Sequence, residues 1–121
     1  MFGGSSIENV IIDTDIGDGI DDAFGLVGAQ LSDSITIQAV VTCWGDVVRR
    51  AQLARTLLYS CGGANIPVFA GAFRSMSSDE EIQTAFDSDG GALYSDTTVD
   101  SRPGVDYMVD SVSSDPQNIS I

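Results

Sequence analysis

Five aspartates lie within ten consecutive positions near the start of this 121-residue chain: Asp13, Asp15, Asp18, Asp21 and Asp22. Carboxylates that are crowded in this way repel one another, and burying them without partners costs free energy. A hard divalent cation that takes oxygen ligands relieves both costs. The spacing of the aspartates therefore predicts a cation site.

Three other interpretations explain this segment less well. Asp21 and Asp22 could stabilise the positive end of a helix dipole, but this leaves three aspartates unexplained. Gly17 and Gly19 are compatible with a phosphate-binding loop, yet the surrounding carboxylates would repel a phosphate. An EF-hand calcium loop requires a bidentate glutamate where Phe24 stands, and a helix in place of the preceding strand.

The residues on either side of the aspartates predict a strand, a turn and a helix. The apolar run from Val10 to Ile12 is typical of a central parallel strand. Apolar residues then recur at helical spacing and predict one face of an amphipathic helix: Ile20, Ala23, Phe24, Val27 and Leu31. The aspartates thus follow the carboxyl end of a strand, where open α/β sheets bind their ligands.

Further along the chain, strands and helices continue to alternate. We expect strands at Val10–Thr14, Ile35–Thr42 and Pro67–Ala70, and a helix at Val47–Ser60 with Asp46 as its N-cap. Val47, Ala51, Ala54, Leu58 and Cys61 form the expected buried stripe of this helix. Such alternation predicts an α/β fold, a parallel sheet with flanking helices.

The last third of the chain begins with an irregular segment. Residues 74–101 are rich in Ser, Asp, Gly and Thr and show no sustained period. A helix then begins with Pro103 at its first position, with Val105, Met108, Val109 and Val112 on one face. The residues from Asn118 to Ile121 predict a fourth strand.

Composition excludes some classes of partner. The net charge is −13, from 18 acidic residues and five arginines, with no lysine or histidine. Such a chain repels nucleic-acid backbones and anionic membranes, and no apolar run approaches the ~20 residues that span a bilayer. Cys43 and Cys61 flank a helix and lie too far apart for a disulfide. Free thiols favour a cytoplasmic location. The sequence does not specify the oligomeric state, and a homo-oligomer is one possibility.

Several segments resemble one known family. Asp13-Thr14-Asp15-Ile16-Gly17 followed by Ile20–Leu26 resembles the N-terminal aspartate motif of the inosine/uridine-preferring nucleoside hydrolases. Ile16 replaces the proline of the common motif, and the turn is two residues longer around Asp18-Gly19. The resemblance continues, in the order of the family, through Val41–Asp46, Arg50–Arg55, Asn65–Ala72 and, more weakly, Val105–Val109.

The resemblance implies hydrolysis of the N-glycosidic bond of ribonucleosides with a bound Ca²⁺. It implies that Asp15 is a metal ligand and the general base for the attacking water. Asp22 would be the second metal ligand, Asp21 would bind the ribose hydroxyls, and Asp13 would support the metal shell. Asp46 stands where many relatives have an asparagine that contacts the ribose, and helix capping is its alternative role.

The resemblance also implies how the chain is organised. Relatives are longer, so residues 1–121 are expected to form the N-terminal part of a single nucleoside-hydrolase-like α/β domain, incomplete or weakly active alone. Two alternatives stay open. Asp13-x-Asp15 after an apolar strand also resembles haloacid-dehalogenase-like phosphatases, although Gly17 departs from their pattern. The chain could also be a non-catalytic, acidic, metal-binding fragment. The preferred nucleobase is not specified by the sequence.

Overall fold

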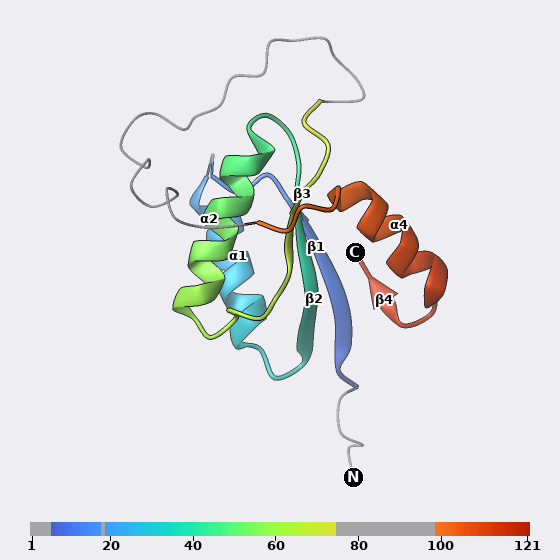
Figure 1. The fold of residues 1–121 in the computed structure, drawn as a ribbon. Coiled ribbons are helices and arrows are strands. Elements are labelled where there is room, and N and C mark those ends of the chain that lie inside the picture. Colours follow the sequence, from blue (N-terminus) through green and yellow to red (C-terminus); the bar gives the residue numbers. More distant parts are fainter. Residues whose placement is uncertain (1–5, 18, 75–98) are drawn as a thin grey trace.

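The computed structural model describes residues 6–17, 19–74 and 99–121, which form a parallel α/β layer (Figure 1). In chain order the elements are β1 (Glu8–Thr14), α1 (Ile20–Leu31), β2 (Ile35–Thr42), α2 (Val47–Ser60), β3 (Val68–Ala70), α4 (Gly104–Ser114) and β4 (Ile119–Ser120). The strands pair in parallel in the order β3-β2-β1-β4. This confirms the predicted fold class. Most of the predicted irregular segment 74–101, and Asp18, lie outside the described residues.

The two central strands end side by side. Thr14 of β1 pairs with Thr42 of β2, and the backbone N–H of Cys43 donates to the carbonyl of Thr14 at 3.0 Å. Because parallel strands have their carboxyl ends at the same edge, the loops that follow β1 and β2 meet there. This edge carries the aspartate segment.

A bulge in the middle of β2 changes which side chains face which layer. Val10 pairs with Ile37 but Ile11 pairs with Ala39, so Gln38 is an extra residue between two regular stretches. Ile37 consequently packs on the side of α1 and α2, whereas Ala39 packs on the side of α4. The two helical layers lie on opposite faces of the sheet (Figure 1).

The buried face of α1 differs from the predicted one. Ile20, Phe24 and Leu31 are 71%, 69% and 66% exposed, whereas Leu26 is 2% exposed. Ala23, which was predicted on the apolar face, packs against the core as expected, together with Ala29 and Leu26. Small residues allow the helix to lie close to α2 and the sheet, so packing selected a face rotated away from the large apolar side chains.

α4 packs through an aromatic and a methionine side chain. Tyr107 and Met108 contact the core, and the ring of Tyr107 stacks on Phe69 with centroids 4.4 Å apart. Val105 and Val109, which were expected on this face, are 42% and 58% exposed.

The start of α4 is fixed by a close approach to the sheet. Pro103 is the N-cap and Gly104 the first helical residue, so the helix begins one position later than predicted. At Gly104 a Cβ atom would lie 2.5 Å from Cγ1 of Val41, so only glycine permits this approach.

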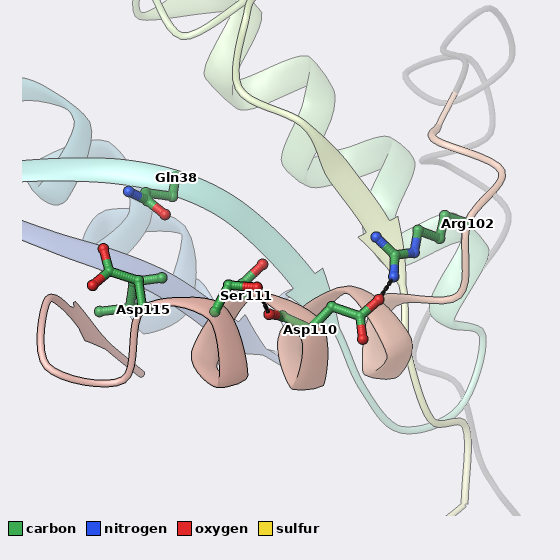
Figure 2. A pocket seen from close by; sticks show the side chains of 7 residues that line it. Gln38, Arg102, Asp110, Ser111 and Asp115 are labelled. Carbon is green, nitrogen blue, oxygen red and sulfur yellow. Dashed lines mark hydrogen bonds and ion pairs between the residues drawn. The ribbon is translucent and has the colours of Figure 1, made fainter.

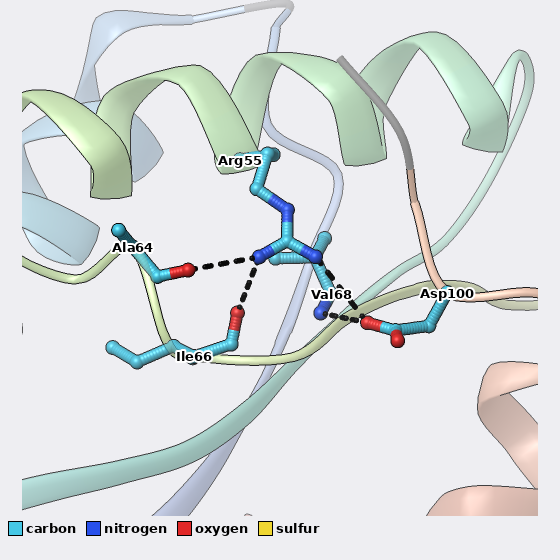
Figure 3. A network of polar contacts seen from close by, with 5 residues as sticks. All are labelled: Arg55, Ala64, Ile66, Val68 and Asp100. Carbon is cyan, nitrogen blue, oxygen red and sulfur yellow. Dashed lines mark hydrogen bonds and ion pairs between the residues drawn. The ribbon is translucent and has the colours of Figure 1, made fainter.

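α2 forms as predicted and is tied to β3 by polar contacts. Asp46 is its N-cap, and Ala51, Ala54 and Leu58 are buried. Arg55 donates to the carbonyls of Ala64 and Ile66 at 3.3 and 3.0 Å, and Oδ2 of Asp100 accepts from both Arg55 and the backbone N–H of Val68 (Figure 3). Within the described residues, no helix is both long enough and apolar enough to span a membrane.

Candidate functional site

The loop between β1 and α1 is held together by the hydroxyl of Thr14. This residue is 7% exposed, and its Oγ1 donates to Oδ2 of Asp22 at 2.5 Å. The same oxygen accepts from the backbone N–H of Ile16 at 3.1 Å. Gly17, with φ of 120°, provides the left-handed conformation that turns the chain after Ile16. The end of the strand and the first turn of the helix are thereby fixed to each other.

Asp15 and Asp22 are neighbours in this loop. The pKa of Asp15 is raised above its ordinary value of 3.8, first by partial burial and then by a hydrogen bond with Asp22 and the charge of Asp22. The charge of Arg50 acts in the opposite direction. Two carboxylates in contact cannot both ionise without repulsion, so this pair is where a cation would be most stabilising.

Asp13 faces the end of the neighbouring strand. The pKa of the Cys43 thiol is raised to about 11, first by burial and then by the charge and a hydrogen bond of Asp13. The charge of Asp15 also contributes. Asp13, Asp15 and Cys43 therefore share one electrostatic environment at the edge where β1 and β2 end.

Asp21 and Asp46 have different surroundings. Asp21 is exposed in the first turn of α1, beside Gly19. The side chain of Asp46 accepts from the backbone N–H of Arg49 at 3.1 Å and lies 3.7 Å from the Arg49 guanidinium. These contacts hold Asp46 against its own helix, which is the capping role that the sequence left open as its alternative.

The described residues can supply part of a metal shell. Among them, no group of three or more His, Cys, Asp or Glu side chains is arranged to hold a metal ion. The adjacent carboxylates of Asp15 and Asp22 are hard oxygen donors, which fit a hard divalent cation. Calcium takes 6–8 oxygens, so this pair fits as a portion of such a site.

Sequence reasoning did not assign a role to Thr14 or Arg50. Arg50 is a charged residue with 0% exposure, and its guanidinium contacts the backbone of the aspartate loop. One signal was available in the sequence. Arg50 falls within the buried stripe of α2, three residues after Val47 and one before Ala51, and a charge at such a position requires partners.

A separate hollow lies between α4 and the sheet (Figure 2). It encloses roughly 400 Å³ and is lined by Gln38, Ile119 and polar residues of α4. Arg102 and Asp110, which form an ion pair, also belong to its lining. The hollow contains none of the site residues predicted from the sequence, so the candidate site remains at the carboxyl edge of β1 and β2.

Comparisons with known proteins agree with the resemblance. The family model described as inosine-uridine preferring nucleoside hydrolase matches residues 10–121. A solved plant nucleoside hydrolase, the PpNRh1 enzyme, is similar with a TM-score of 0.76 and 30% sequence identity over 93% of this chain. The chain spans 37% of the length of that enzyme. Among curated proteins, none matches the sequence significantly. These findings do not favour the phosphatase alternative.

Proposed function

Because the chain belongs to the inosine-uridine preferring nucleoside hydrolase family, we propose that it carries part of a calcium-dependent site that hydrolyses the N-glycosidic bond of ribonucleosides. One observation supports this most directly: the carboxylates of Asp15 and Asp22 are neighbours at the carboxyl edge of the central strands. Family membership supports a metal cofactor and a ribonucleoside substrate. The proposal extends this to Ca²⁺ and to named residues.

The residues of the loop divide the chemistry among them. Asp15 and Asp22 hold the cation, and Asp15 accepts the proton of the attacking water. Thr14 fixes the orientation of Asp22 through their hydrogen bond. The exposed carboxylate of Asp21 binds ribose hydroxyls. Calcium, when bound, lowers the pKa of the attacking water.

Negative charge at this edge also favours the transition state. Glycosidic cleavage passes through an oxocarbenium-like state, whose positive charge nearby carboxylates stabilise. Asp13 supports the metal shell through its place beside Asp15 and Cys43. A role for Asp46 at the ribose requires that its carboxylate leave the backbone of Arg49 that it now caps.

The isolated chain is proposed to have little or no turnover. Two fixed carboxylates leave most of the calcium ligands to be supplied by water. Water ligands do not fix the attacking water and the ribose in the relative positions that the reaction requires. The sequence also contains no histidine to protonate a departing base. A non-catalytic metal-binding role of this segment is the second candidate. A longer chain that covers the remaining length of the family separates the two, because only a catalytic site would give turnover that depends on Asp15.

Calcium titration of the thermal transition tests the metal site. A ligand that binds only the folded chain raises its stability, by about 2.7 kcal/mol at 100 times the Kd. Asp15→Asn should abolish this increase. Asp33→Asn is the matched control, because it removes the same charge from an exposed turn before β2, at the opposite edge of the sheet.

The comparison must use the calcium-induced shift of each variant. The raised pKa of Asp15 means that its ionised form already destabilises the metal-free protein, so Asp15→Asn changes the starting Tm. Equal shifts in Asp15→Asn and Asp33→Asn would indicate nonspecific charge neutralisation and contradict the proposal. Release of free base from inosine or uridine at an enzymatic rate, lost in Asp15→Asn, would contradict the proposed lack of turnover.

A further inference from the structure

Arg50 is a fully buried cation one helical turn into α2. Its exposure is 0%, although it is a long, permanently charged side chain. Burying such a charge costs several kcal/mol unless hydrogen bonds and nearby dipoles compensate for it. The partners of Arg50 therefore indicate what this burial holds in place.

Three backbone carbonyls from two loops accept hydrogen bonds from the guanidinium. Nη1 donates to the carbonyls of Asp15 and Ile16 at 2.5 and 2.9 Å. Nε donates to the carbonyl of Trp44 at 2.6 Å. The first two carbonyls belong to the loop after β1, and the third belongs to the loop after β2. Arg50 thus connects the two loops at the edge where the candidate site lies.

The loop after β2 is held in an unusual conformation. Trp44 has φ of 63°, which bulky residues rarely adopt. Its backbone N–H donates to the carbonyl of Ala72 at 2.8 Å, and its ring lies 5.6 Å from the guanidinium carbon of Arg50. The Trp44 end of the connection is therefore itself fixed by the protein, so Arg50 can hold the loop after β1 in position.

We propose that Arg50 is a positioning residue that fixes the backbone carrying Asp15, so that the Asp15 carboxylate stays beside Asp22. The positioning of the loop follows from the contacts of this chain. Its consequence for cation binding rests on the proposed function. Arg50 binds the backbone carbonyl of Asp15, so this contact acts on the part of the chain that carries the carboxylate.

A lysine cannot reproduce this arrangement. The guanidinium is planar and presents five donors in fixed directions, whereas an ammonium is a compact charge on a flexible stem. Arg50→Lys keeps the charge but loses the connection between the loops. Arg55→Lys is the matched control, because Arg55 is on the same helix and also binds two backbone carbonyls. These belong to Ala64 and Ile66, outside the loop that carries Asp15 (Figure 3).

Hydrogen exchange of the metal-free chain tests the positioning directly. In Arg50→Lys, the peptide that covers residues 13–17 should exchange at least about 10-fold faster, because local opening becomes easier. In Arg55→Lys this peptide should exchange as in the parent, even if both variants lose global stability. Unchanged exchange in Arg50→Lys, or equal acceleration in both variants, would overturn the proposal.

Terbium luminescence, with Tb³⁺ as a probe for calcium, tests the consequence for binding. Removing a residue that orients a ligand typically weakens metal affinity 10–100-fold, so Arg50→Lys should lose about 10-fold and Arg55→Lys less than about twofold. Equal affinities would overturn the role of Arg50 while leaving the proposed function intact. A parent chain that binds no Tb³⁺ would instead refute the proposed metal site, and the exchange result would still decide whether Arg50 positions the loop.

A measurement on the parent chain covers the case in which Arg50→Lys does not fold. The Nε–H signals of the arginines are observable by NMR. Addition of calcium should shift the signal of Arg50, which bonds the Asp15 loop, and leave that of Arg55 in place. Shifts of equal size at both arginines, or none at Arg50 when calcium binds, would count against the proposal.

Discussion

At the scale of single residues, the position of Asp13 beside Cys43 controls the reactivity of the thiol. The thiol sits at the end of β2, and burial together with the Asp13 carboxylate raises its pKa to about 11. A thiol with an ordinary pKa of 9.0 has roughly 100 times more thiolate at pH 8, and only the thiolate is a nucleophile. Cys43 should therefore be unreactive at neutral pH despite incomplete burial.

Alkylation kinetics test this arrangement. In a Cys61→Ser background, which leaves one thiol, iodoacetamide should modify Cys43 slowly at pH 8, and the rate should continue to rise toward pH 11. Asp13→Asn removes a negative charge that opposes the thiolate, so it should accelerate the reaction a few-fold at pH 8, with burial still slowing it. Asp33→Asn serves as the charge-matched control. An Asp13→Asn rate equal to that of the control would mean that Asp13 does not face the thiol.

Residue types alone predicted part of the candidate site. Crowded aspartates at a strand end predicted a cation site because charge repulsion is visible in a sequence, and the family resemblance then selected Asp15 and Asp22 among them. Arg50 and Thr14 were not assigned roles, because they act on backbone carbonyls and on one carboxylate that only the fold brings near. The pairing of the ends of β1 and β2 is a feature of the tertiary structure, and no local sequence motif encodes it.

At the scale of elements, the buried face of α1 could not be predicted from the apolar pattern alone. The sequence placed Phe24 on the expected face, yet Phe24 is 69% exposed and Leu26 is 2% exposed. Both positions carry apolar side chains, so helical periodicity could not distinguish them. The strands were predicted more closely, since the apolar runs that form β2 and β3 have no alternative face to choose.

Paired substitutions in α1 test its orientation. Leu26→Ala should destabilise the chain by about 2–4 kcal/mol, because it leaves a cavity in the core beneath the helix. Phe24→Ala should change the free energy of unfolding by less than about 0.5 kcal/mol, as at most exposed sites. Urea denaturation measures both values. A larger loss for Phe24→Ala than for Leu26→Ala would show that the helix packs through the face predicted from the sequence.

At the scale of the whole molecule, the acidic excess is largely uncompensated. The net charge is −13, and Arg49, Arg55 and Arg102 each pair with one aspartate. Arg50 donates to three backbone carbonyls. Repulsion among the remaining carboxylates destabilises the folded chain relative to a more expanded one. General screening and specific cation binding should therefore both stabilise it, by different physical routes.

Ionic strength separates these two routes. Raising NaCl from 10 to 150 mM shortens the Debye length from about 30 to 8 Å, so repulsion between distant carboxylates falls and Tm should rise. This increase should be nearly the same in the parent, Asp15→Asn and Asp33→Asn, because each variant removes only one of 18 acidic groups. A further increase on adding calcium at constant 150 mM NaCl should remain in the parent and in Asp33→Asn but not in Asp15→Asn, since screening of distant charges is already largely complete. If calcium adds nothing above NaCl in any of the three chains, then screening alone stabilises the molecule, and the paired carboxylates of Asp15 and Asp22 do not bind the ion in this chain.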